Sequence, residues 1–226
     1  MTKSRATAAL VTRADIFDGS GTYEVVEAVK HYLSLARPST SPTVAPTFDY
    51  RAAFEVLAQE RIRLKFGAVE NTLAVATFDP ESEGRSRFID ALARMGILVE
   101  AVDFRRADVT LPLVGDSDRR HITSLAPNIA YALGLLAGRP SAEVVVVTRS
   151  FELLDPLNDF VRRGGKAAIA FFRRFLDGRF GLAGLFDGES DVKFIDLDPH
   201  SERLLGYDVR DIGSIRSPRT EGISGL

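Results

Sequence analysis

Apolar residues along this chain fall into two alternating patterns, short continuous runs and helix-spaced positions. Short apolar runs bounded by turn residues predict strands at 13–17, 72–78, 97–104, 143–148 and 166–171. Apolar residues that recur every three or four positions predict helices at 22–36, 50–61, 84–95, 127–137 and 151–163. The run EVVVVT at 143–148 is apolar on both faces, which is typical of the centre of a parallel sheet.

The order of these segments predicts the fold class. Strands alternate with helices from residue 13 to residue 171, which favours an α/β, doubly wound, mainly parallel sheet of about five strands flanked by helices. The segment VKFIDL at 192–197 offers a further edge strand. In such sheets ligands bind at the carboxyl ends of the strands, so the residues that follow each strand are the candidates for chemistry.

The chain of 226 residues suits one domain with appendages. Prolines and Ser/Thr crowd residues 37–47, and a second run of loop-forming residues covers 105–120. We expect one domain over 8–175, an extension over 176–212 that packs on it, and a disordered tail over 213–226.

The composition of the chain excludes several kinds of functional site. The chain has no cysteine, which excludes disulfides, thiolate metal sites and a cysteine nucleophile. Its three histidines are far apart in sequence, and its net charge of −2 provides no global basic field for nucleic acid. We expect a cytoplasmic protein without membrane contacts, because no apolar run approaches the roughly 20 residues that span a bilayer. A protein partner or a homo-oligomer stays open.

Asp18 ends the first predicted strand, in the sequence IFDGSG. The glycines after it allow a sharp turn and a close approach of a ligand to the backbone. A carboxylate at that place suits Mg²⁺ or Mn²⁺. An aspartate before glycine is equally typical of a turn or of a helix cap.

Polar residues also follow the third and fourth strands. The loop after the third strand contains Asp116, Asp118 and Arg120, a pattern that suits either a cation site or a solvated turn. After the fourth strand come Thr148, Arg149, Ser150 and Glu152, where Ser150 can cap the next helix and Glu152 favours its first turn. A local basic patch is a further hypothesis for the set Arg162, Arg163, Lys166, Arg173 and Arg174.

Several of these pieces, in this order, resemble the NYN branch (LabA-like) of the PIN-like nuclease superfamily between Asp15 and Phe172. IFDGSG resembles the ending of the family's first strand, and RFIDALARMGILVEAVDF resembles its middle helix and strand. PNIAYALGLLAG and EVVVVTRSFELLDPLNDFVRRGGKAAIAFF resemble the helix with an inward acid, the acidic strand end and the closing strand.

The resemblance implies a metal-dependent ribonuclease that hydrolyses RNA phosphodiesters with Mg²⁺ or Mn²⁺ held by acids at strand ends. Asp18 matches the family's first acid, Glu152 its last, and Thr148 the Ser/Thr of the fourth strand. The other acidic positions fall on neutral residues, namely Asn128, Gly134 and Ser150. The acidic site is therefore incomplete, which implies weakened activity.

Two hypotheses follow from the resemblance. In the first, the chain is an endoribonuclease whose ligands are Asp18 and Glu152, with Asn128 or the pair Asp116 and Asp118 assisting. Substrate would then contact Thr148, Arg149, Ser150 and Arg120. In the second, the chain is a catalytically inactive family member that binds nucleic acid or protein.

A third interpretation rests on NIAYALGLLAG, which faintly resembles a helix of nucleotide-cleaving TIR-like and deoxyribosyltransferase-like folds. The catalytic glutamate of that helix falls on Ala132 here, so this chemistry is not expected.

Overall fold

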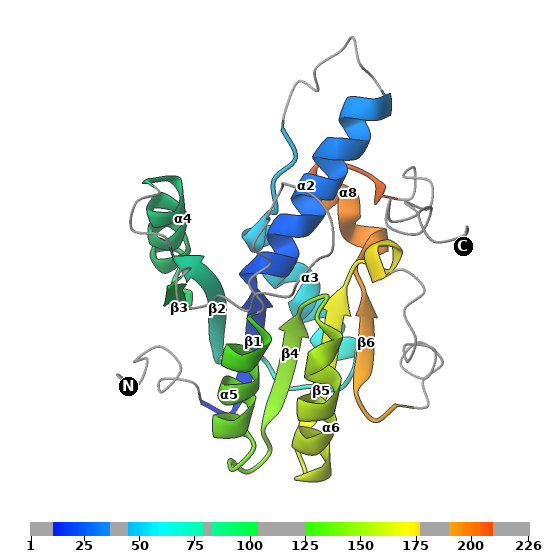
Figure 1. The fold of residues 1–226 in the computed structure, drawn as a ribbon. Helices are drawn as coiled ribbons and strands as arrows, with labels where there is room; N and C mark the ends of the chain where they lie inside the picture. The colour runs from blue at the N-terminus through cyan, green and yellow to red at the C-terminus, as the bar shows by residue number, and fades with distance from the viewer. Residues whose placement is uncertain (1–10, 37–44, 79–82, 104–124, 177–189, 210–226) are drawn as a thin grey trace, which may run out of the picture.

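The structure, a computed structural model, describes residues 11–36, 45–78, 83–103, 125–176 and 190–209 (Figure 1). Its centre is a six-stranded sheet in the order β3-β2-β1-β4-β5-β6, and every pair of neighbouring strands is parallel. The strands are β1 (Arg13–Asp18), β2 (Asn71–Phe78), β3 (Leu98–Asp103), β4 (Glu143–Val147), β5 (Lys166–Phe171) and β6 (Lys193–Asp196). The predicted doubly wound α/β class is therefore confirmed, and the segment KFID supplies the edge strand expected near residue 192.

Helices cover both faces of the sheet. They are α2 (Gly19–Ala36), α3 (Tyr50–Arg63), α4 (Glu83–Arg94), α5 (Ala126–Leu136), α6 (Leu154–Arg162) and α8 (Ser201–Leu205). Short 3-10 turns lie at η1 (Phe151–Leu153), η2 (Arg173–Leu176) and η3 (Asp198–His200). In Figure 1, α5 and α6 lie in front of the sheet and α3 behind it, while α2 extends beyond the carboxyl ends of the strands. No helix within the described ranges is both long and apolar enough to cross a membrane.

The two central strands are buried because helices cover them on both sides. All five residues of β4 are buried, as the apolar run predicted, and so are the last five residues of β1. These strands are neighbours in the sheet although their register partners, such as Phe17 and Val147, are far apart in sequence. From β1 the chain continues to β2 and β3 on one side, and from β4 it continues to β5 and β6 on the other. In doubly wound sheets ligands generally bind at such a reversal, which lies here at the carboxyl ends of β1 and β4.

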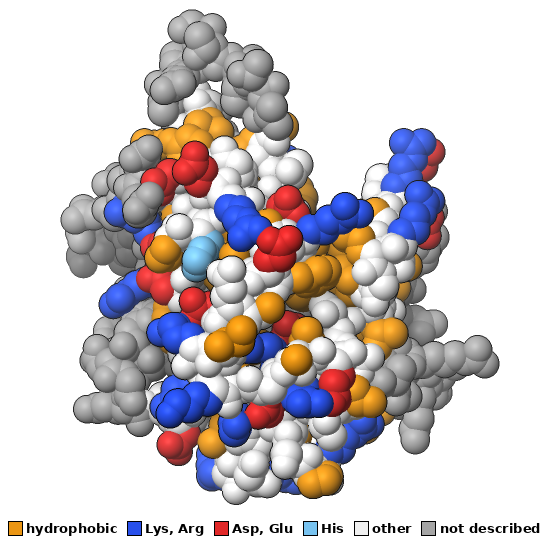
Figure 2. All heavy atoms as spheres, turned by 180° about the vertical axis from the view of Figure 1, so that it is seen from behind, with side chains coloured by type: hydrophobic (Ala, Val, Ile, Leu, Met, Phe, Trp, Pro, Cys, Tyr) orange, Lys and Arg blue, Asp and Glu red, His pale blue; other side chains and the backbone are white. Residues whose placement is uncertain are grey.

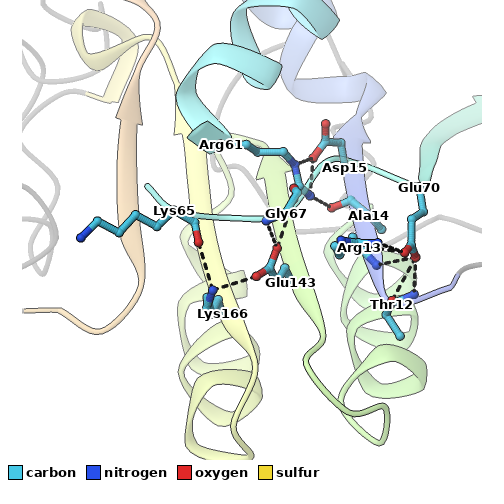
Figure 3. A network of polar contacts seen from close by, with 10 residues as sticks. All are labelled: Thr12, Arg13, Ala14, Asp15, Arg61, Lys65, Gly67, Glu70, Glu143 and Lys166. Atoms are coloured by element: carbon cyan, nitrogen blue, oxygen red, sulfur yellow. Dashed lines mark hydrogen bonds and ion pairs between the residues drawn. The ribbon is translucent and has the colours of Figure 1, made fainter. Parts of the chain in front are cut away.

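At the opposite, amino edge of the sheet, a buried arginine joins α3 to β1 (Figure 3). Arg61 is 1% exposed and donates from Nε to Asp15 Oδ1 at 2.8 Å, from Nη2 to Ala14 O at 2.8 Å and from Nη1 to Gly67 O at 3.0 Å. Burial raises the pKa of the Asp15 carboxyl, and the Arg61 guanidinium opposes that rise. Because a buried charge needs a partner, this pair holds the end of α3 against the first strand.

The same cluster continues to β4 and β5. Glu143, the first residue of β4, accepts hydrogen bonds from Gly67 N and, at 2.8 Å, from Lys166 Nζ. The Arg61 guanidinium lies 3.8 Å from the Glu143 carboxylate. These contacts, here called the Arg61 network, tie one helix, one loop and the starts of three strands together at Ala14, Asp15, Arg61, Gly67, Glu143 and Lys166 (Figure 3).

Residues 190–209 contribute directly to the fold. Strand β6 pairs with β5, and α8 packs against α3 on the rear of the sheet. The amide of Asp49 donates to Leu204 O at 2.8 Å, while the Asp49 side chain caps α3. The predicted tail at 213–226 and the predicted loop at 105–120 lie outside the described residues, as does most of the loop at 37–47.

Candidate functional site

The carboxyl ends of β1 and β4 bring two predicted site residues into contact. Thr148 follows β4, and its hydroxyl donates to Asp18 Oδ2 at 2.7 Å across 130 positions of sequence. Both side chains are buried, with Asp18 3% and Thr148 1% exposed. The Thr148 oxygen in turn accepts from the amide of Ser150 at 2.9 Å. The contact forms because parallel neighbours in a sheet present their carboxyl ends at one edge.

The second oxygen of Asp18 caps α2. Asp18 Oδ1 accepts from Ser20 Oγ at 2.6 Å, from Ser20 N at 3.0 Å and from Gly21 N at 3.3 Å. These bonds start α2 at Gly19, three residues before the predicted start, because they satisfy amides that a helix end leaves without partners. A Cβ on Gly21 would lie 3.4 Å from Asp18 Oδ2 and 3.5 Å from Arg149 N, so glycine lets the helix start approach β4 closely.

Asp18 is a buried acid surrounded by neutral donors. Two backbone amides and two hydroxyls, from Ser20, Gly21 and Thr148, bond to it, and no ion pair of Asp18 occurs within the described residues. A carboxylate has roughly four lone-pair sites, about two on each oxygen. Oδ1 accepts three hydrogen bonds and has no free site, whereas Oδ2 accepts only the bond from Thr148. Oδ2 therefore retains the capacity to bind a cation, and the helix cap does not exclude a metal at this residue.

The other predicted metal ligands do not form a described cluster with Asp18. Glu152 lies exposed on η1, two residues after Ser150. Asp116, Asp118 and Arg120 lie outside the described residues. Across the part of the chain that the structure describes, no group of three or more His, Asp or Glu side chains is placed to hold a metal ion. A metal site built from described residues therefore has at most two acids.

Asn128 contacts an acid that the sequence analysis did not single out. Asn128 Nδ2, on α5, donates to Glu100 Oε1 at 3.2 Å, and Glu100 is 8% exposed in the middle of β3. Val75 is the register partner of both Asp18 and Glu100, so the two acids lie in one row across β1, β2 and β3. Strand spacing puts their Cα atoms about 10 Å apart. A charged residue within the apolar run ILVEAVDF was the signal available in the sequence.

Ser150 does not cap a helix through its side chain, and Arg149 is paired with an acid. The Ser150 side chain makes no cap hydrogen bond, and the structure replaces the predicted helix 151–163 by η1 followed by α6. Arg149 forms an ion pair with Glu24 of α2, and the two side chains are about one-third exposed. A partly exposed guanidinium therefore lies beside the start of α2.

The five basic residues considered as a patch do not form one. Arg162 ends α6 and Arg163 follows it at the amino edge, where Lys166 starts β5 in the Arg61 network. Arg173 and Arg174 follow β5 at the carboxyl edge. On the rear face, basic and acidic side chains are interspersed, in agreement with the net charge of −2 (Figure 2). Binding of a polyanion would therefore depend on local groups such as Arg149.

A buried tyrosine supports the start of α2. The Tyr50 hydroxyl lies 3.2 Å from Thr22 Oγ1, which also bonds to Gly19 O. Burial raises the pKa of the Tyr50 phenol to about 12, the hydrogen bond to Thr22 opposes the rise, and the charge of Asp18 adds to it. The Asp18 carboxylate is therefore close enough to the Tyr50 phenol for its negative charge to disfavour ionisation of the phenol.

The raised pKa of Tyr50 can be tested by following the ionisation of its phenol at alkaline pH. The pKa of Tyr50 is about 12 in the folded protein against 10.0 for an ordinary phenol, so its contribution to stability is complete below pH 10 and is lost as the pH rises toward 12. In an alkaline absorbance titration, Tyr50→Phe should remove the tyrosine that ionises last. Asp18→Asn should lower the midpoint of that tyrosine, and a Tyr50 midpoint near 10 would contradict the interpretation.

The architecture and this edge together define a doubly wound α/β protein with a polar site where the sheet reverses its strand order. Comparison of the chain with protein-family models, with curated proteins and with solved structures found no match in any of the three.

Proposed function

We propose that this chain is a metal-dependent ribonuclease-like domain of the NYN/PIN-like type, acting on RNA phosphodiesters with one Mg²⁺ or Mn²⁺ ion at Asp18. The observation that carries the proposal is the place and state of Asp18. It is buried at the strand-order reversal, it has no cationic partner within the described residues, and Oδ2 retains acceptor capacity.

The charge of Asp18 also argues for a cation between the protein and a phosphate. Helix starts attract anions through their free amides, but here Asp18 Oδ1 already occupies the amides of Ser20 and Gly21. A phosphate approaching the same place would meet a carboxylate. Mg²⁺ commonly lies between two such negative groups, since it binds through one or two carboxylates together with substrate phosphates and several waters.

The chain's own groups then have distinct roles. Bound metal would polarise the phosphodiester and activate water for hydrolysis. Asp18 supplies the inner carboxylate, and Thr148 holds Oδ2 in place by its hydrogen bond. Arg149, which pairs with Glu24, would bind a phosphate oxygen of the substrate, and the exposed Glu152 carboxylate would orient the attacking water. Because the described acids are few, metal affinity without RNA should be weak, and activity should be lower with Mg²⁺ than with the more tightly bound Mn²⁺.

A second candidate is a module that binds nucleic acid or protein without cleaving it. The observation that favours it is the absence, among the described residues, of a cluster of three metal-ligating side chains. In this case the four hydrogen bonds to Asp18 serve to fix α2 against β4, and the site holds no metal.

Cleavage of labelled single-stranded RNA with Mn²⁺ tests the proposal. Asp18→Asn should lower the rate about 100-fold or more, because the metal loses its charged ligand while asparagine still caps the helix. Asp159→Asn is the matched control, since Asp159 is exposed on α6 and pairs with Arg163. Its rate should equal that of the wild type.

The outcomes separate the two candidates. Cleavage that a chelator stops and that Asp18→Asn loses supports the nuclease. Equal rates in the wild type and in Asp18→Asn would contradict the metal site and indicate a contaminating enzyme. Salt-sensitive RNA binding without cleavage in either protein would support the binding module.

A further inference from the structure

Helix α5 presents an uncharged, apolar face to solvent. It contains no charged residue, unlike every other α-helix in the part of the chain that the structure describes. Tyr131 is 47% exposed and Leu135 is 37% exposed, and the two lie one turn apart on the same side of the helix. A helix that is apolar all round is normally buried on all sides. The outer face of α5 is therefore a candidate contact surface.

A glycine on the same face points to close contact with another helix. Gly134 lies inside α5, where glycine is less favourable than alanine because its backbone loses more freedom on folding. A Cβ at this position would meet no described atom within 4 Å. The described residues of one chain therefore do not require glycine here. A helix packed from outside would, since the side chains at the contact decide how closely two helices approach.

Helix α6 lies beside α5 in front of the sheet, and its charges change sign along its length (Figure 1). Asp155 is in its first turn and Arg162 in its last, and both side chains are exposed. Neither forms an ion pair within the described residues. A second α6 that runs in the opposite direction would bring Asp155 of one copy close to Arg162 of the other, where opposite charges attract.

We infer that α5 and α6 form the contact surface of a symmetric homodimer, in which each helix packs antiparallel against the same helix of a second copy. A twofold axis that crosses both helices gives this arrangement, because it reverses the direction of each. The two uncharged α5 faces then meet near Gly134, and the Asp155–Arg162 pairs flank them, as polar groups flank the apolar core of other interfaces.

The size of this surface indicates a weak dimer. The face is about 16 Å long, from the length of α5, and about 20 Å wide, from the spacing of packed helices. That is at the low end for specific interfaces, so monomers and dimers should exchange at micromolar concentrations.

Sedimentation velocity of the full chain between about 1 µM and about 500 µM tests the inference. Tyr131→Glu should weaken the dimer at least about 100-fold, because the two copies would bury like charges against each other. Gly134→Ala should weaken it about tenfold by overpacking the contact. The same variant should raise the unfolding temperature at a concentration where the wild type is monomeric, because alanine favours the helix. These opposite effects separate a contact between copies from a structural role within one chain.

Charge exchange on α6 tests the antiparallel arrangement. Asp155→Arg alone and Arg162→Glu alone should each weaken the dimer by about 2- to 10-fold, because each replaces an attraction by a repulsion. The double variant restores opposite charges, so its dissociation constant should return to within about twofold of the wild type. A double variant as weak as the single ones would overturn this arrangement.

Ile62→Glu is the matched control, since Ile62 is 78% exposed on α3, behind the sheet (Figure 1). It should leave the dimer unchanged. Equal weakening by Tyr131→Glu and Ile62→Glu would overturn the inference. So would a wild type that stays monomeric up to about 500 µM, which would assign the α5 face to a different partner. None of these results bears on the proposed nuclease, whose test is cleavage of RNA.

Discussion

Replacement of Arg61 by methionine is expected to lower the free energy of unfolding by about 3–5 kcal/mol. The side chain is 1% exposed, and its loss leaves the Asp15 carboxylate buried without its cation. The same change removes the donors to Ala14 O and Gly67 O. Urea denaturation followed by circular dichroism measures the effect.

Arg63 provides the control for this prediction. It lies two positions later on α3, is exposed, and pairs with Glu60. Arg63→Met should change the free energy of unfolding by no more than about 0.5 kcal/mol. The double variant Arg61→Met/Asp15→Asn should lose less free energy of unfolding than the sum of the losses in the two single variants. The reason is that the double variant no longer buries an unpaired carboxylate. A loss below about 1 kcal/mol in Arg61→Met would contradict the role assigned to the Arg61 network.

Replacement of Phe17 by alanine should lower the free energy of unfolding by about 3–5 kcal/mol. Phe17 is fully buried in β1, with ring centroids 5.4 Å from Tyr50, 5.8 Å from Phe54 and 6.4 Å from Phe48. Alanine removes these contacts and leaves a cavity directly before Asp18. Thermal and urea unfolding of the variant measure the loss.

Phe88 is the matched aromatic for comparison. Its ring also contacts Tyr50, at 5.9 Å, but its side chain is 38% exposed on α4. Phe88→Ala should cost about 1 kcal/mol, the value of an aromatic pair with partial burial. Equal losses in Phe17→Ala and Phe88→Ala would show that burial on β1 is not what stabilises this cluster.

Much of the fold was accessible from the sequence because the local signals agree with the tertiary environment. The run EVVVV is buried on both faces of β4, and the helix spacing in 50–61 matches α3. The start of α2 was placed three residues late, since its cap depends on the Asp18 side chain. The break between η1 and α6 also has no signal in apolar spacing.

The candidate site was accessible in part. Asp18 and Thr148 each follow an apolar run, so the sequence marked both as residues at strand ends. Their contact depends on strand order, because it requires that β1 and β4 be neighbours. Glu100 went unnoticed because its importance depends on register across three strands and on Asn128, which reaches it from α5.

The sequence by itself determined the alternation of strands and helices, the buried character of β4 and the acid at the end of β1, because these depend on residue type and local spacing. Only the tertiary structure decided which residues meet. It joined Arg61 to Asp15, and Thr148 to Asp18, across 46 and 130 positions of sequence. Pairings of that kind follow from the order in which strands assemble and from the burial of charge, neither of which a local pattern encodes.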